Sequence, residues 1–157
     1  RYPLEIFEAV RRVWPSEKPL GMRISASDWD DAGWTIDDSV IFARELKQLG
    51  CDFVDCSSGG NSPNRPPVGP GFPGYQLPFS EQVRNESDIP TIAVGMLRDY
   101  HLAEEAISNG KADLIALGRG MLFDSRWAWH AAHELGGKAS YPNQYARSEP
   151  EKWPKAF

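Results

Sequence analysis

Four short apolar segments recur along the chain, and a stretch with helical spacing follows each of them. The segments span residues 20–25, 52–56, 91–94 and 112–117. Three of the four are nearly continuous apolar runs, which is typical of parallel strands that are covered on both faces. Strands that alternate with helices at this spacing pair in parallel through right-handed crossovers. The pattern therefore predicts an α/β fold.

The predicted helices have recognisable ends. Apolar side chains recur at helical spacing in five stretches, residues 2–14, 35–50, 78–86, 102–108 and 125–135. Thr35 and Asp38 fit a capping box, and Asp99 is placed to cap the fourth helix. The chain therefore reads as a leading helix and four βα units, followed by a tail with no clear period.

Two architectures accommodate this order of elements. One is an open, doubly wound sheet, and the other is half of a (β/α)8 barrel. A complete barrel takes about 250 residues, whereas this chain has 157 residues. The chain can therefore supply about half of a barrel.

Composition excludes several classes of partner. The chain has 17 Lys and Arg against 22 Asp and Glu, a net charge of −5. A nucleic acid or an anionic membrane would require a concentrated basic face, so we expect neither as a partner. No apolar run approaches the roughly 20 residues that span a bilayer. The start of the chain has neither an initiator Met nor a signal-peptide pattern.

The two cysteines, Cys51 and Cys56, are too few for a disulfide framework or a zinc site. We expect them to be reduced thiols in a cytoplasmic protein.

The first two predicted strands carry candidate site residues. Arg23 lies inside the first strand, where a cation is costly unless it is paired or bound to a ligand. A salt bridge from Arg23 to Asp55 is the structural alternative. The second strand ends in Ser-Ser-Gly-Gly at residues 57–60, and small residues there allow a ligand to approach the backbone closely.

Glycines end the third and fourth predicted strands, as Gly95-Met96 and Gly118-Arg119. Exposed backbone N–H groups and a guanidinium suit a phosphate. In (β/α)8 barrels a phosphate site often follows strands seven and eight, the ranks that these two strands would hold. Neither a Walker loop nor a G-x-G-x-x-G fingerprint occurs, which weakens the doubly wound alternative.

Other polar clusters offer less chemistry. Asp28, Asp30 and Asp31 resemble a metal loop, but Ala32 stands where the third ligand should be. We therefore expect a solvated acidic loop and no metal site. The three histidines fall in predicted helices, away from the strand ends. The chain thus offers a cofactor cradle without an evident acid, base or nucleophile.

Several of these segments, taken together, resemble the Old Yellow Enzyme family of FMN-dependent ene-reductases, in particular its thermophilic-like branch. The matching segments are residues 1–2, 22–28, 54–59, 72–76, 93–96 and 112–119. They occur in the family's order and at similar spacing. The resemblance implies that residues 1–136 form half of a TIM barrel, strands five to eight. Residues 137–157 would then form a tail that docks on a neighbouring subunit.

The resemblance also implies a role for each candidate residue. Arg23 would lie beside the flavin pyrimidine edge, where its charge stabilises the reduced, anionic flavin. Ser58 and Gly59 would line the ribityl and phosphate side of FMN. The phosphate cradle would comprise Gly95, Met96, Gly118 and Arg119.

In the tail, Arg147 resembles an arginine that enters a neighbouring subunit's active site. Trp153 and Phe157 are alternatives for that contact.

The implied function is an ene-reductase that transfers hydride from NAD(P)H, through FMN, to the β-carbon of an activated alkene such as an enone. The family's substrate-binding pair and proton donor belong to strands one to four, which have no counterpart here. We therefore expect activity only with the N-terminal barrel half, as a separate chain or a cleaved fragment. The start at Arg1 falls just after the family's fourth strand. We also expect the complete barrel to form a homo-oligomer.

Two other functions remain compatible with the sequence. One is a non-catalytic half-barrel that binds FMN or phosphate, or serves as a scaffold. The other is a different phosphate-handling barrel enzyme that uses no flavin.

Overall fold

The computed structural model describes residues 1–61, 63 and 72–154 of the chain. Part of the predicted loop after the second strand and the last three residues lie outside this range. The contacts divide the chain into two compact units, Arg1–Leu117 and Gly118–Phe157.

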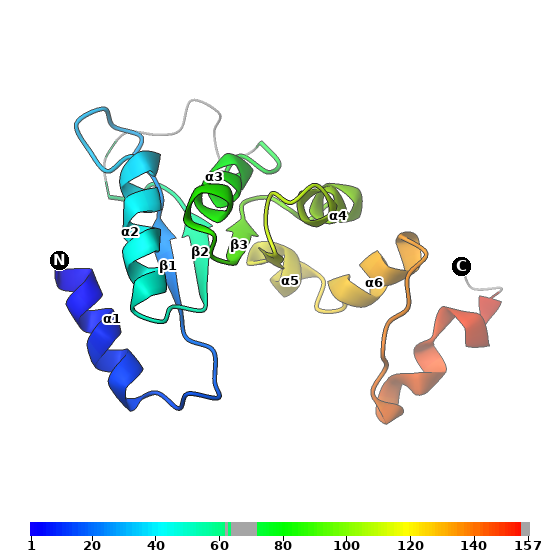
Figure 1. Cartoon of the computed structure of the whole chain (residues 1–157). Helices are drawn as coiled ribbons and strands as arrows, with labels where there is room; N and C mark the ends of the chain where they lie inside the picture. Colours follow the sequence, from blue (N-terminus) through cyan, green and yellow to red (C-terminus); the bar gives the residue numbers. More distant parts are fainter. Residues whose placement is uncertain (62, 64–71, 155–157) are drawn as a thin grey trace. The chain divides into compact units, whose positions relative to one another are not determined.

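The first unit is built on a parallel sheet of four strands, of which Figure 1 labels β1, β2 and β3. The strands are β1 (Gly21–Ser25), β2 (Phe53–Ser57), β3 (Thr91–Val94) and β4 (Leu114–Ala116), and they lie side by side in sequence order. Right-handed crossovers between parallel strands in this order all pass over the same face. A doubly wound sheet would instead reverse its strand order. The α/β prediction is therefore confirmed, and the order is that of consecutive barrel strands.

The helices of the first unit begin close to where their sequence signals predicted. They are α1 (Tyr2–Val13), α2 (Ile36–Gln48), α3 (Leu77–Ser87) and α4 (Tyr100–Ser108). The capping box before α2 is confirmed, because Asp38 N–H donates to Thr35 Oγ1 and Asp38 Oδ2 accepts from Thr35 N–H. Asp99 caps α4 by accepting from Leu102 N–H. No helix in the described ranges is long and apolar enough to cross a membrane.

Alternate residues of the strands face the helices and form the core. Ile24, Val54 and Cys56 from the sheet pack with Leu46 of α2 and Val83 of α3 in one cluster of buried side chains. The residues between them point to the opposite face, because side chains alternate along a strand. Arg23 and Asp55 lie on that opposite face.

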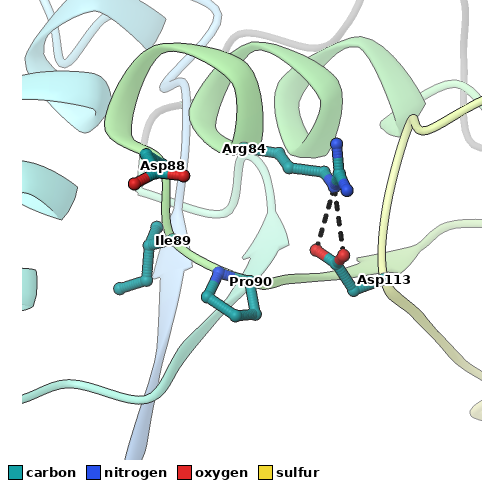
Figure 2. A pocket seen from close by; sticks show the side chains of 5 residues that line it. All are labelled: Arg84, Asp88, Ile89, Pro90 and Asp113. Carbon is teal, nitrogen blue, oxygen red and sulfur yellow. Dashed lines mark hydrogen bonds and ion pairs between the residues drawn. The ribbon is translucent and has the colours of Figure 1, made fainter.

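The Asp113 carboxylate joins α3, β3 and β4 at the amino ends of these two strands (Figure 2). Both oxygens of Asp113 accept from Nε of Arg84 on α3, each at 3.1 Å. Asp113 Oδ2 also accepts from the backbone N–H of Thr91, the first residue of β3, at 2.9 Å. Asp113 therefore fixes α3 and β3 to the start of β4. That strand, Leu114–Ala116, is shorter than the one predicted over 112–117.

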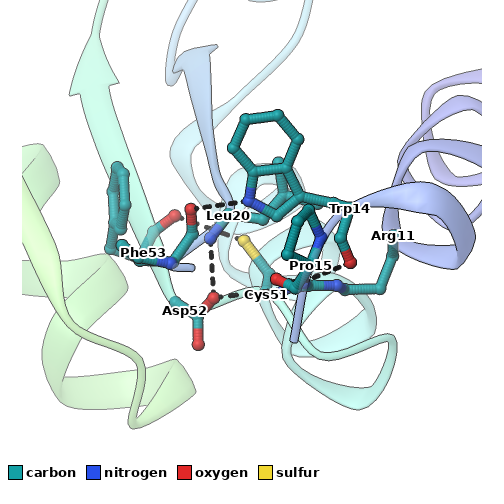
Figure 3. A network of polar contacts seen from close by, with 8 residues as sticks. Arg11, Trp14, Pro15, Leu20, Cys51, Asp52 and Phe53 are labelled. Carbon is teal, nitrogen blue, oxygen red and sulfur yellow. Dashed lines mark hydrogen bonds and ion pairs between the residues drawn. The ribbon is translucent and has the colours of Figure 1, made fainter. Parts of the chain in front are cut away.

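A second carboxylate has the same function at the start of β1 and β2 (Figure 3). Asp52 Oδ2 accepts from Leu20 N–H at 2.7 Å and from Nη1 of Arg11 at 3.4 Å. Arg11 also donates to the carbonyl of Pro15 at 3.0 Å, which secures the turn after α1. In (β/α)8 barrels this end of the strands serves stability, whereas ligands bind at the carboxyl ends.

The second unit contains α5 (Arg119–Phe123), α6 (Trp127–Glu134), and the 3-10 helices η1 (Asn143–Ser148) and η2 (Pro150–Lys152). The sequence predicted α6 but neither α5 nor the 3-10 helices. Stacking explains why the tail is not separate from α6. The Trp129 ring centroid lies 4.6 Å from that of Tyr141 and 5.6 Å from that of Tyr145. By their contacts, α6 and the tail lie in one unit that begins at Gly118. The division expected after residue 136 stays a prediction.

We predict that Thr35→Ala lowers the free energy of unfolding by about 1 kcal/mol at neutral pH, because α2 loses its cap. The hydrogen bonds from the Thr35 hydroxyl and backbone hold the pKa of Asp38 below its ordinary value. Such a carboxyl contributes stability above its unfolded-state pKa and loses it as the pH falls through the folded-state pKa. Urea titrations should therefore show a smaller difference from wild type near about pH 2 than near about pH 7. Thr35→Ser, which keeps the hydroxyl, is the control.

We predict that Asp113→Ala lowers the free energy of unfolding by about 1–3 kcal/mol, because Thr91 N–H loses its acceptor. The ion pair with Arg84 is about one-third exposed on both sides and adds less than about 1 kcal/mol. Asp113→Asn keeps an acceptor and should lose less. Asp31→Ala, at an exposed loop position, is the matched control in the same denaturant titration. Equal losses for Asp113→Ala and Asp31→Ala would contradict this assignment.

Candidate functional site

Serine hydroxyls tie together the carboxyl ends of β1 and β2. Ser57 Oγ donates to the carbonyl of Ile24 at 2.9 Å, and Ser25 Oγ donates to the carbonyl of Gly59 at 3.0 Å. Gly59 N–H donates in turn to the carbonyl of Ser27 at 2.8 Å. Internal donors therefore occupy these carbonyl oxygens, which makes this edge of the sheet less repulsive to an anion.

Arg23 lies in the middle of β1, on the sheet face opposite to the core. Its side chain is 57% exposed, and Nη1 lies 3.2 Å from Oδ2 of Asp55. Asp55 is the residue paired with Arg23 in the β1–β2 register. The salt bridge considered as an alternative is therefore present. It engages Nη1, and because a guanidinium has five donors, Arg23 can hold Asp55 and a ligand together.

Asp55 is the more buried member of this pair, with a side chain that is 15% exposed. Burial raises the pKa of the Asp55 carboxyl, and the opposite effect of the Arg23 charge is smaller. Its Oδ1 is buried and has no hydrogen-bond partner among the described residues. A cation beside a carboxyl with a raised pKa is typical of functional sites.

The glycines after β2 keep space open at the strand end. Gly59 and Gly60 have φ values of +73° and +90°, a region that favours glycine. A Cβ on Gly59 would lie 3.4 Å from Cδ1 of Trp29, whereas a Cβ on Gly60 would meet no atom of the described residues within 4 Å. No described residue therefore blocks the backbone at Gly60, and the approach of a ligand to this segment stays a prediction.

The end of β3 turns through two residues with positive φ, Gly95 at +124° and Met96 at +57°. A Cβ on Gly95 would lie 2.9 Å from Nε2 of Gln76 and 3.1 Å from Cε1 of Tyr75. The carbonyl of Gly95 accepts from Gly74 N–H at 2.9 Å. The backbone conformation and the close neighbours both require glycine at position 95. Gly95 and Met96 thus follow β3 directly, as predicted.

Gln76 joins the ends of β2 and β3, and the sequence analysis assigned it no role. Its Oε1 accepts from Ser58 Oγ at 2.6 Å, and its Nε2 donates to the carbonyl of Val94 at 3.0 Å. The residue is 3% exposed. The available signal was a glutamine directly before a helix, within the motif at residues 72–76. Buried amides of this kind are hydrogen-bonded on both sides.

The remaining candidate residues belong to the second unit. Gly118 is the N-cap of α5, and Arg119 is the first residue of that helix. Arg147 lies in η1, and Trp153 follows η2. Phe157 lies outside the described residues. The predicted contacts of these residues with phosphate or with a neighbouring subunit stay predictions.

Other reactive groups have structural roles. Burial raises the pKa of the Cys56 thiol to about 12, which keeps the sulfur protonated and a poor nucleophile. His130 lies in α6, where its Nδ1 is 2.8 Å from Oδ2 of Asp124. Asp28 organises its loop by accepting from Trp34 N–H at 3.0 Å. In the described part of the chain, no three His, Cys, Asp or Glu side chains gather as metal ligands.

The polar groups of the first unit fit one side of an FMN molecule. Arg23 offers an exposed positive charge. Gly60 borders space that no described residue fills. Ser58 adds a hydroxyl at the same ends of the strands. A positive charge near a flavin ring tunes its electronics, and polar groups can hydrogen-bond to its ribityl hydroxyls. The residues present are therefore compatible with FMN.

Comparison with curated proteins identifies close relatives by sequence. The chain is 47% identical over 143 residues to the NADPH dehydrogenase of Geobacillus thermodenitrificans, covering 91% of this chain and 41% of that protein. It is 44% identical over 147 residues to the NADPH dehydrogenase of Bacillus subtilis, covering 94% of this chain and 42% of that protein. The chain thus spans about two fifths of the length of these relatives.

Comparison with solved structures identifies the fold. A 2-naphthoyl-CoA reductase in complex with 2-naphthoyl-CoA matches with a TM-score of 0.70 at 19% identity, over 87% of this chain and 21% of that one. Histamine dehydrogenase from Rhizobium sp. 4-9 matches with a TM-score of 0.69 at 20% identity, over 87% of this chain and 19% of that one. Both matches cover only part of TIM-barrel flavoenzymes, which confirms the predicted half-barrel.

A sequence profile of flavin-dependent oxidoreductases matches residues 1–137, which include all four strands of the sheet. With the NADPH dehydrogenase relatives, this match confirms the resemblance to the Old Yellow Enzyme family. The chain belongs to the NADH:flavin oxidoreductase / NADH oxidase family.

Proposed function

We propose that this chain is the flavin-binding half of an NAD(P)H-dependent FMN oxidoreductase that reduces activated alkenes, such as enones. The observation that carries the proposal is Arg23, an exposed cation on the face of the sheet that lies inside a barrel of this family. FMN, when bound, supplies the ring that accepts hydride from NAD(P)H and donates it to the β-carbon of the alkene.

Arg23 is the residue of this chain that acts on the flavin ring. A fixed positive charge beside the pyrimidine edge favours the anionic, reduced form of a flavin. The contact with Asp55 at 3.2 Å holds the guanidinium on the sheet face and restricts its orientation. Arg23 therefore contributes both charge and placement.

The glycine turns and the serine bind the rest of the cofactor. Ser58 and Gly59 contact the ribityl and phosphate side. The phosphate site comprises Gly95, Met96, Gly118 and Arg119. The space beside Gly60, which no described residue fills, supports this assignment because it leaves backbone accessible at the strand end.

Completion of the barrel requires four more strands. Within the described residues, β1 and β4 are the outer strands of the sheet, and Leu114 of β4 is 57% exposed. Exposed strand edges with apolar side chains are prone to aggregation. The partner is the polypeptide segment that carries strands one to four, and the complete barrel self-associates through the tail that contains Arg147.

The location that this assembly would occupy is the cytoplasm. Cys51 and Cys56 are both buried free thiols, which suits a reducing compartment.

The activity test joins this chain with strands one to four of the barrel, either by mixing purified halves or by fusion. We predict that the assembled barrel retains FMN through gel filtration and oxidises NAD(P)H when an enone is added. FMN binding without enone reduction would indicate a non-catalytic flavin-binding half-barrel. An assembled barrel that remains colourless after saturation with FMN would contradict the proposal and favour a barrel enzyme that uses no flavin.

We predict that Arg23→Ala in the assembled barrel leaves FMN bound but slows its reduction by NAD(P)H about 10- to 100-fold. This range corresponds to the loss of one charge-assisted interaction, about 1.5–3 kcal/mol. Stopped-flow absorbance of the flavin measures the rate. Arg44→Ala is the matched control, because Arg44 lies on α2 and donates to the backbone carbonyl of Glu86. An unchanged rate would mean that Arg23 only forms its ion pair with Asp55 and does not act on the flavin.

A further inference from the structure

Gln76 connects three segments that are separate in the sequence. It is the N-cap residue of α3, its Oε1 lies 2.6 Å from Ser58 Oγ, and its Nε2 lies 3.0 Å from the carbonyl oxygen of Val94. Ser58 directly follows β2, and Val94 is the last residue of β3. One side chain therefore spans the two strand ends at which the cofactor is proposed to bind.

The carbonyl of Val94 determines the direction of every hydrogen bond in this chain of contacts. A carbonyl oxygen can only accept, so the amide nitrogen of Gln76 must face Val94. The amide oxygen then faces Ser58, and that oxygen can also only accept. Ser58 must therefore donate its single hydroxyl proton to Gln76.

The surroundings hold the Gln76 amide in this orientation. The residue is 3% exposed, and its Nε2 occupies the space that a Cβ on Gly95 would take. Gly74 N–H donates to the carbonyl of Gly95 at 2.9 Å, which holds the loop before α3 against the end of β3. A flipped amide would place an oxygen against the Val94 carbonyl, and two acceptors in contact repel each other.

We propose that Gln76 is a positioning residue that makes Ser58 a hydrogen-bond acceptor toward the ligand. Since the hydroxyl proton of Ser58 is committed to Gln76, only the oxygen lone pairs remain for a bound molecule. Ser58 then selects a ligand hydroxyl, as on the ribityl chain of a flavin, and not a phosphate oxygen, which is itself an acceptor. This inference rests on the proposed function and assigns Ser58 and the phosphate to different parts of the cofactor.

The first test needs no flavin and uses the full chain. Hydrogen exchange of side-chain amides, followed by NMR, should show the Gln76 amide protected at least about 10-fold relative to that of Gln82. Gln82 is on the same helix and donates to Asp37 at the surface, so it is an internal control. Ser58→Ala should shift the Gln76 amide signals. Exchange of the Gln76 amide at the rate of Gln82 would contradict its hydrogen bonds to Ser58 and Val94.

The second test compares FMN with riboflavin, which lacks the phosphate, in the assembled barrel. Gln76→Met should lower the affinity for both flavins by the same factor, about 10-fold, because the lost interaction involves the ribityl chain. Arg119→Ala should lower the affinity for FMN and leave the affinity for riboflavin unchanged. Gln82→Met is the matched control and should change neither affinity. Fluorescence quenching on titration measures the affinity of each variant and of the wild type for both flavins.

The outcomes separate the inference from the function on which it rests. A loss for Gln76→Met that is confined to FMN would overturn the assignment of Ser58 to a ligand hydroxyl. Failure of the wild-type barrel to bind either flavin would overturn the proposed function, and the assignment of Ser58 with it. In either case, the exchange experiment tests the hydrogen bonds of the Gln76 amide to Ser58 and Val94 directly.

Gln76→Glu gives a further check that a purely structural role would not produce. A protonated carboxyl can donate to Val94 and accept from Ser58, as the amide does, whereas a carboxylate cannot donate. Riboflavin affinity of this variant should therefore rise toward the wild-type value as the pH is lowered. An affinity that falls or stays constant would contradict the hydrogen-bond directions.

Discussion

The parallel register of the four strands is the constraint on which the other features depend. Pairing of Arg23 with Asp55, and of Cys56 with Ala93, aligns the strands in one direction. All carboxyl ends then lie at one edge of the sheet, and sequential strand order carries the crossover helices over one face. The opposite face carries Arg23 and Asp55 on β1 and β2, and the apolar Ile92 and Leu114 at the same level on β3 and β4. In (β/α)8 barrels this carboxyl edge is where ligands bind.

Charged and neutral polar groups are distributed unequally between the two edges of the sheet. At the amino edge, Asp52 and Asp113 each accept a backbone N–H at the start of a strand and pair with an arginine from a helix. At the carboxyl edge, serine hydroxyls and the Gln76 amide bind backbone carbonyls instead. Asp52 and Asp113 thus stabilise the starts of the strands, whereas Asp55 is paired with Arg23. An anionic cofactor is compatible with such a distribution of charge.

Much of this arrangement could be predicted from the sequence because its signals are local. The capping box at Thr35 lies within four residues, and the glycine turn at Gly95 directly follows an apolar run. The hydrogen bonds of Gln76 and Asp113 could not be predicted in this way, because their partners are 18 to 29 residues away in the sequence. Their roles depend on packing that no short motif encodes. The same holds for the aromatic contacts of Trp129, which place residues after 136 in one unit with α6.

The close approach of Gln76 to Gly95 links the evolutionary histories of the two positions. A methyl group at position 95 would lie 2.9 Å from the glutamine amide, on a backbone with φ of +124°. A larger residue at position 95 is therefore tolerated only after position 76 has become smaller and the turn has changed its conformation. Neighbouring substitutions of this kind are not additive. The order in which mutations arise is thus restricted, and homologues that lose the glycine should already have lost the glutamine.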